Sequence, residues 1–274
     1  MQNFSINSRS DGLKLHGYQW STENPVAVVS LVHGMAEHCG RYEELAQHLN
    51  QNGIDVVGVD LRGHGLTEGP RGVSQQYADI AGDVSTLVEE TKFQYPTLPR
   101  FLFGHSLGGG LVLHHGMTAV DDAISGYLVS APLILPHKPV SGLTRGLVKM
   151  LRKMLPKGTL PIPVSGKKIS TISQEQDRYN SDLLRNRRVG IGLAVDMIET
   201  GEKLSATAGQ WEKPLRMWHS KSDKITSFDA SKSFAQQAKN CEFTAFDEVR
   251  HEMHQDRSRD DVHALMVKFI LESR

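Results

Sequence analysis

The chain has 274 residues, in which 31 lysine and arginine residues balance 31 aspartate and glutamate residues. Zero net charge excludes a whole-protein basic field for nucleic acid, and a content of 39% hydrophobic and 23% charged residues excludes a disordered chain. The length predicts one globular domain with an elaboration. Because no run of about 18 apolar residues occurs, we predict no membrane-spanning helix.

Short runs rich in β-branched residues alternate with helical segments through the first 130 residues. Strands are expected at 26–32, 55–60, 100–103 and 126–130, with helices at 42–51 and 80–93 between them. Further strands are expected at 215–219 and 242–246, before a closing helix at 261–271. This alternation predicts a mostly parallel sheet covered by helices on both faces.

The alternation stops between residues 136 and 205. No run there is typical of a buried strand, and 13 basic residues against 6 acidic ones give this segment a charge of +7. We therefore predict an inserted helical cap at 136–205 between two halves of one core, at 1–135 and 206–274.

Part of the predicted cap has the pattern of an amphipathic helix that ends at Pro156. Its apolar arc consists of Leu143, Leu147, Met150, Leu151, Met154 and Leu155. The opposite arc is basic and consists of Arg145, Lys149, Arg152 and Lys153. Two interpretations stay open. Either the apolar face packs on the core and the basic face is solvated, or the helix docks on lipid with its basic residues against anionic head groups.

A candidate nucleophile lies in the sequence Gly-His-Ser-Leu-Gly at 104–108, which fits the pattern G-x-S-x-G. An expected strand leads into this motif and a helix-compatible stretch follows it. In that setting a strained turn holds the serine hydroxyl above the sheet edge. Ser106 is therefore the predicted nucleophile.

A serine nucleophile needs a base and an acid that orients the base. In this architecture both follow later strands, in the chain order serine, acid, histidine. Asp223 follows the expected strand 215–219, and His251 follows the strand 242–246. The alternatives are Asp229 as the acid and His254 as the base, although Asp229 falls within an expected helix.

The transition state of acyl transfer also needs hydrogen-bond donors for its oxyanion. The backbone N–H of Leu107, directly after the nucleophile, is one candidate. The loop after the first expected strand, at 33–38, should supply the other, with Met35 best placed. The histidines at 251 and 254 lack the i,i+4 spacing of a zinc helix, so we predict no metal site.

Several motifs together resemble the monoacylglycerol lipase and lysophospholipase branch of the α/β-hydrolases. They are HGMAEH at 33–38, GRY at 40–42, DLRGHG at 60–65, GHSLGG at 104–109 and YNSD at 179–182. The resemblance implies the α/β-hydrolase fold and a serine esterase without a cofactor, acting on long-chain acyl glycerol esters. It also implies Ser106, Asp223 and His251 as the triad, and the amides of Met35 and Leu107 as the oxyanion hole.

The same resemblance implies a polar end of the substrate pocket, where the family holds the glycerol hydroxyls. The residues that the resemblance places at this polar end are Glu37, Arg41 and His254, together with Tyr179. An alternative interpretation of Glu37 and Arg41 is a local i,i+4 ion pair.

Other functions remain to be distinguished from a monoacylglycerol lipase. A lysophospholipase or a broad-specificity esterase would use the same triad. An iminopeptidase-type peptidase would need an acidic anchor in the cap, yet residues 136–188 contain 12 basic and only three acidic residues. A non-catalytic binding protein of the same fold would not need an intact triad.

Two isolated cysteines, Cys39 and Cys241, suit a reducing compartment, and the first ten residues lack the apolar stretch of an export signal. We therefore predict a cytoplasmic protein, peripheral at a membrane if the cap helix docks there. Its predicted partner is a small lipid ester, with no nucleic acid, cofactor or obligate protein partner.

Overall fold

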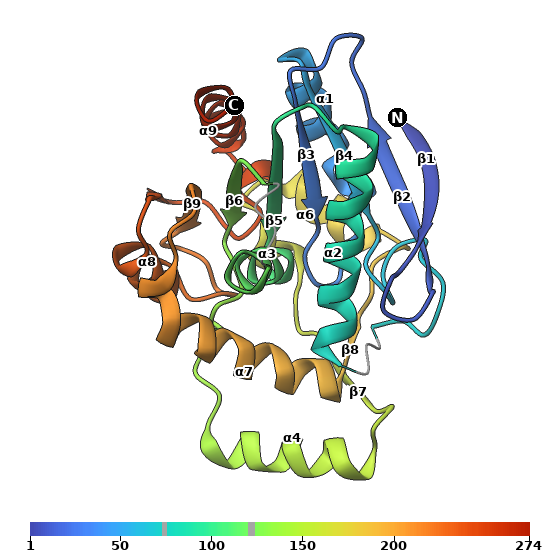
Figure 1. Cartoon of the computed structure of the whole chain (residues 1–274). Helices are drawn as coiled ribbons and strands as arrows, with labels where there is room; N and C mark the ends of the chain where they lie inside the picture. Colours follow the sequence, from blue (N-terminus) through green and yellow to red (C-terminus); the bar gives the residue numbers. More distant parts are fainter. Residues whose placement is uncertain (73–75, 120–123) are drawn as a thin grey trace.

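A computed structural model describes residues 1–72, 76–119 and 124–274. Eight strands in these residues form one sheet in the order β1-β2-β4-β3-β5-β6-β9-β10 (Figure 1). They are β1 (Gln2–Asn7), β2 (Lys14–Trp20), β3 (Ala27–Val32), β4 (Ile54–Val59), β5 (Arg100–His105), β6 (Gly126–Ser130), β9 (Leu215–Ser220) and β10 (Cys241–Phe246). All neighbours from β4 to β10 run parallel, whereas β2 is antiparallel to both β1 and β4. The predicted mostly parallel sheet is confirmed.

Helices cover both faces of this sheet. One face packs against α1 (Glu43–Gln51) and α9 (Arg259–Glu272). The other packs against α2 (Tyr77–Gln94), α3 (Leu107–Thr118) and α8 (Phe228–Gln237). Every residue of β3 and β4 is buried, as expected for a parallel strand with helices on both sides. Two apolar cores, one on each face, hold the sheet in place.

The hairpin of β1 and β2 is absent from the sequence prediction. In β1 exposed residues alternate with half-buried ones, because this strand lies at the edge of the sheet and packs on one side only. Its Phe4 and Ile6 are the half-buried residues that pack on the core. Two apolar residues in six are too weak a signal to identify a strand.

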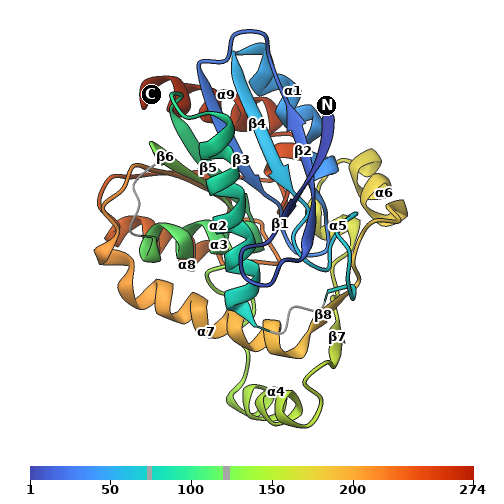
Figure 2. The ribbon, with the colours of Figure 1, turned by 45° about the vertical axis from the view of Figure 1, so that its right-hand side comes forward.

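The segment 136–205 connects β6 to β9, which are neighbours in the sheet. It contains α4 (Gly142–Met154), β7 (Thr159–Pro161), α5 (Gly166–Ile169), α6 (Ser173–Ser181), β8 (Arg188–Gly190) and all but the last two residues of α7 (Ile191–Thr207). The two three-residue strands pair with each other and not with the main sheet. In both views α7 crosses beneath the sheet, and α4 lies outside α7 (Figures 1 and 2).

The amphipathic helix α4 is oriented with its apolar face outward. Four side chains form what we call the outer row: Leu143 is 90% exposed, Leu147 52%, Met150 51% and Met154 68%. The interpretation in which this face packs on the core is therefore wrong. None of the described helices is long and apolar enough to cross a bilayer.

The opposite face of α4 is held on α7 by three ion pairs, which we call the ion-pair ladder. Arg145 pairs with Glu202, Lys149 with Glu199 at 2.7 Å, and Arg152 with Asp196 at 2.5 Å. Basic residues one turn apart on α4 thus meet acidic residues one turn apart on α7. Three of the four basic residues of the helix are engaged with the protein itself.

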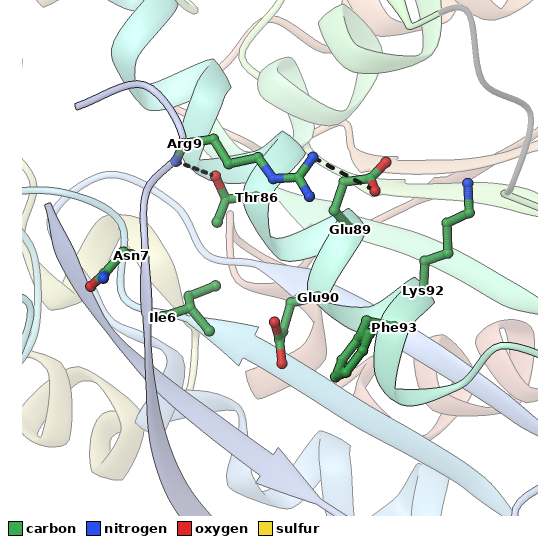
Figure 3. A pocket seen from close by; sticks show the side chains of 8 residues that line it. All are labelled: Ile6, Asn7, Arg9, Thr86, Glu89, Glu90, Lys92 and Phe93. Atoms are coloured by element: carbon green, nitrogen blue, oxygen red, sulfur yellow. Dashed lines mark hydrogen bonds and ion pairs between the residues drawn. The ribbon is translucent and has the colours of Figure 1, made fainter. Parts of the chain in front are cut away.

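A surface hollow of about 550 Å³ lies between β1 and the C-terminal half of α2 (Figure 3). Arg9 crosses it, with its backbone N–H bonded to Thr86 Oγ1 at 3.0 Å and its guanidinium 3.7 Å from Glu89. Phe93 at its rim is 80% exposed. None of the predicted site residues lines this hollow.

Candidate active site

Ser106 lies on a strained turn between β5 and α3. Its φ of 53° and ψ of −116° fall outside the regions that side-chain-bearing residues normally adopt. The two flanking glycines allow this turn: a Cβ on Gly104 would lie 2.3 Å from the carbonyl oxygen of Gly108, and one on Gly108 would lie 2.1 Å from that of Val32. The G-x-S-x-G motif therefore has the strand–turn–helix context that the sequence predicts.

Asp223 and His251 form a buried pair beyond the ends of β9 and β10. His251 Nδ1 lies 2.6 Å from Asp223 Oδ2. Burial opposes ionisation of Asp223, but the charge of His251 and hydrogen bonds from His219 and His251 hold the pKa of this carboxyl well below its ordinary value. Burial likewise opposes protonation of His251, yet the charge and hydrogen bond of Asp223 raise its pKa overall. A carboxylate that orients a basic imidazole is the arrangement expected of a general base.

Ser106 and His251 line the same cavity of about 130 Å³. No hydrogen bond of Ser106 Oγ is found among the described residues, and the distance between such groups often shortens only when substrate binds. Apolar side chains from the core and from segment 136–205 make up much of the remaining wall: Met35, Leu133, Ile162, Val164, Ile169, Met197 and Ile225. The nucleophile and the base thus face a small, largely apolar pocket.

The loop at 33–38 lies directly against the nucleophile. A Cβ on Gly34 would come within 3.1 Å of Ser106 Cβ. Neither the N–H of Met35 nor that of Leu107 donates a hydrogen bond to another of the described residues. Two amide donors beside the serine hydroxyl are what an oxyanion hole requires.

A cluster of charged residues contributes to the wall of this cavity. Glu37 and Glu252 line it, and Arg41 lies behind them with its Nη2 2.6 Å from Glu252 Oε2. Glu37 Oε1 accepts from the backbone N–H of Gly34 at 2.5 Å and from Tyr42 Oη at 2.8 Å, whereas Glu37 Oε2 is buried without a hydrogen bond. Burial and the neighbouring Glu252 raise the pKa of Glu37 to about 7. The Glu37–Arg41 contact at 3.5 Å is part of this network and is not an isolated i,i+4 pair.

The other two predicted pocket residues differ in position. Tyr179 of α6 lines the cavity, and its ring packs against the guanidinium of Arg185 at 3.7 Å. His254 lies outside the cavity lining, stacked on Tyr42 with ring centroids 4.9 Å apart. Burial lowers the pKa of His254 well below its ordinary value, so this ring is neutral.

Two polar neighbours of the site were missed from the sequence. Glu252 is the residue directly after His251, but its partner Arg41 is 211 residues away. His219 lies on β9 with its Nε2 3.1 Å from Asp223 Oδ2. Among the described residues, no group of three or more His, Cys, Asp or Glu side chains could hold a metal ion.

Comparison with known families supports this site. A family model described as serine aminopeptidase S33 matches residues 23–258, which is most of the chain. The chain belongs to this family. Its fold is that of the α/β-hydrolases, as the sequence motifs predicted.

Of three similar proteins, two are named as monoacylglycerol or monoglyceride lipases. A monoacylglycerol lipase of Mycolicibacterium smegmatis is 31% identical over 75% of this chain and 74% of its own length. An abhydrolase domain-containing protein of Dictyostelium discoideum is 30% identical over 90% of this chain, which spans about a quarter (26%) of that relative. A soluble variant of the Saccharomyces cerevisiae monoglyceride lipase, solved with a substrate analogue, superposes with a TM-score of 0.89 at 23% identity, covering 99% of this chain and 94% of that one. Family and fold together support a carboxylic ester hydrolase.

Proposed function

We propose that the protein hydrolyses monoacylglycerol-like esters through an acyl-enzyme on Ser106. The hydroxyl of Ser106 attacks the ester carbonyl carbon while His251 takes its proton, and Asp223 holds the imidazole in the required tautomer. The N–H groups of Met35 and Leu107 bind the resulting oxyanion. The observation that carries this proposal is the 2.6 Å contact between Asp223 and His251, because His251 lines the same cavity as Ser106.

The second half of the reaction reverses these roles. His251 returns its proton to the glycerol oxygen, which breaks the carbon–oxygen bond and releases glycerol. A water molecule then loses a proton to His251 and attacks the acyl-enzyme, and collapse of the second tetrahedral intermediate frees the fatty acid and restores Ser106. These steps use the three side chains, the two backbone N–H groups and water.

The cluster of Glu37, Arg41 and Glu252 favours an uncharged, hydroxyl-bearing head group. Arg41 lies outside the cavity lining, and its charge is already offset by Glu252 at 2.6 Å and by Glu37 at 3.5 Å. A phosphate in the cavity would instead face two carboxyl groups. Glu37 Oε2 lies 3.5 Å from Arg41 Nε but forms no hydrogen bond, so it can accept from a hydroxyl, and when protonated it can also donate. These contacts favour monoacylglycerol over the lysophospholipase alternative.

A matched substrate set tests this choice. We expect kcat/KM for a 1-monoacylglycerol to exceed that for the lysophosphatidate of the same acyl chain by about 100-fold or more, because like charges brought together cost several kcal/mol. A p-nitrophenyl butyrate reports whether the triad works at all, and an aminoacyl anilide tests the peptidase alternative. Equal rates on the glycerol and phosphate esters would contradict the proposed head-group selection.

We further propose that segment 136–205 acts as a cap and docks on a lipid surface through the outer row of α4. Four exposed leucine and methionine side chains on one helix face are typical of an interfacial helix. The ion-pair ladder alters the expected electrostatics, since Arg145, Lys149 and Arg152 are paired with α7. Docking should therefore depend on apolar contact and only weakly on anionic lipid or salt.

Vesicle binding tests the docking proposal. Replacing Leu147 and Met150 with serine should weaken binding to phosphatidylcholine vesicles about tenfold or more, because two half-exposed side chains can no longer enter the interface. The same variant should keep its rate on p-nitrophenyl butyrate. Phe93→Ser, which removes a more exposed apolar side chain that lines the hollow of Figure 3, is the control. Unchanged vesicle binding in the double variant would eliminate the proposal.

A further inference from the structure

Asp223 binds two histidines through one oxygen. Its Oδ2 accepts from His251 Nδ1 at 2.6 Å and from His219 Nε2 at 3.1 Å, with Thr226 Oγ1 at 3.0 Å. Its Oδ1 accepts from the backbone N–H groups of Ile225 at 2.7 Å and Thr226 at 3.2 Å. The position of this oxygen therefore depends on His219 as well as on the proposed base.

The second histidine is itself fixed on its other side. Ser231 of α8 lies with its Oγ 2.8 Å from His219 Nδ1. The chain thus contains a second serine–histidine–aspartate array that shares Asp223. His219 contacts Asp223 through Nε2 and the serine through Nδ1, whereas His251 contacts Asp223 through Nδ1. His219 and Ser231 are both fully buried, so this array cannot receive a substrate.

One tautomer of His219 satisfies all of these contacts. Burial lowers the pKa of His219 although Asp223 acts in the opposite direction, so the ring is neutral and carries a single N–H. Because ionised Asp223 can only accept, Nε2 must carry the proton, and Nδ1 then accepts from the hydroxyl of Ser231. A neutral donor stabilises the carboxylate and spreads its charge without adding a positive charge to the site.

We propose that His219 is a positioning residue that sets both the orientation of Asp223 and the basicity of His251. Without the Nε2–H donor, Asp223 would concentrate its charge on His251 and hold the imidazolium too strongly. The His251 proton would then be returned less readily at neutral pH. This inference rests on the proposed function of the triad.

The groups around His251 are the same in the wild type and in a His219 variant, and Glu37, with a pKa of about 7, titrates in both. The titratable groups that face the pair are Glu37 and Glu252 from the cavity, His105 with its ring 4.6 Å from that of His251, and His254 with its ring 5.0 Å from that of His105. Burial lowers the pKa of His105 and of His254 well below the ordinary value, so both stay neutral through the relevant range. A change in the titration of His251 in a His219 variant can therefore be assigned to Asp223.

The test compares His219→Leu, which removes the donor, with His219→Gln, whose amide can donate to Asp223 and accept from Ser231. Activity of each variant on p-nitrophenyl butyrate is measured against pH, and the low-field proton resonance of His251 Nδ1–H is followed over the same range. His219→Leu should raise the acid-limb pKa of kcat/KM by roughly half to one pH unit, with the same shift in the resonance. His219→Gln should restore the wild-type profile.

An acid limb that stays in place in His219→Leu, or moves to lower pH, overturns the inference even if thermal stability falls. If His219→Leu does not fold, Ser231→Ala decides, because it frees the tautomer and should shift the limb in the same direction by a smaller amount. An unmoved limb in Ser231→Ala then overturns the inference. Failure of the triad itself is distinguishable, since Ser106→Ala would then retain esterase activity while the resonance still reports on His251.

Discussion

Replacing Ser106 with alanine is expected to lower kcat for a p-nitrophenyl ester by about 10⁴-fold or more. The oxyanion donors and the pocket remain, so only their residual contribution to the rate should survive. The strained turn is expected to tolerate alanine, since the hydroxyl forms no hydrogen bond with the described residues. Steady-state kinetics measure the loss of turnover, and covalent labelling with a fluorophosphonate measures the loss of the nucleophile.

Ser85→Ala is the matched control for this experiment. Ser85 lies on the exposed side of α2 and bonds only to the carbonyl of Ala81 at 3.3 Å. It should keep both activity and labelling. Esterase activity of Ser106→Ala within tenfold of the wild type would contradict the assignment of the nucleophile.

Replacing His251 with alanine should be nearly as severe. The other histidine of the described cavity lining, His105, is bonded to Ser130, and burial lowers its pKa well below the ordinary value. The expected loss in kcat is again about 10³- to 10⁴-fold. In the wild type, activity should fall as the pH falls through the raised pKa of His251, since protonation removes the base. The acid limb of kcat/KM should accordingly lie above the ordinary histidine value of about 6.5.

A variant of His254 shows whether a loss of activity comes from removing the catalytic base or from disturbing the packing near it. His254→Phe keeps a ring against Tyr42 and should retain kcat within about tenfold, because this residue lies outside the cavity lining. Circular dichroism tests whether both variants fold. A severe loss in His254→Phe together with an active His251→Ala would reverse the assignment of the base.

The catalytic candidates could be predicted from the sequence because chain order and strand ends constrain them strongly. In a parallel sheet the carboxyl ends of all strands meet at one edge, so Ser106, Asp223 and His251 had to lie near one another once their strands were recognised. The contacts of Glu252 and His219 could not be predicted in this way. Glu252 pairs with an arginine 211 residues away, and His219 is an internal residue of β9 whose orientation depends on the pleat.

The orientation of α4 is a second feature that could not be predicted from the hydrophobic pattern. An amphipathic pattern identifies two faces but does not say which one meets the protein. That was decided by Asp196, Glu199 and Glu202 on α7, whose spacing of three residues matches the basic face of α4. Comparing the charge patterns of the two helices would have found this arrangement, whereas hydrophobicity alone favoured neither orientation.

Residues of the outer row affect the surface of the protein much more than its folding stability. A leucine buried in a core typically contributes about 2 to 5 kcal/mol to folding relative to alanine, but Leu143 at 90% exposure has little burial to lose. Substitutions along this face should leave Tm almost unchanged. Substitutions can therefore change the outer row at little cost in folding stability, so the surface that α4 presents can change while the fold stays the same.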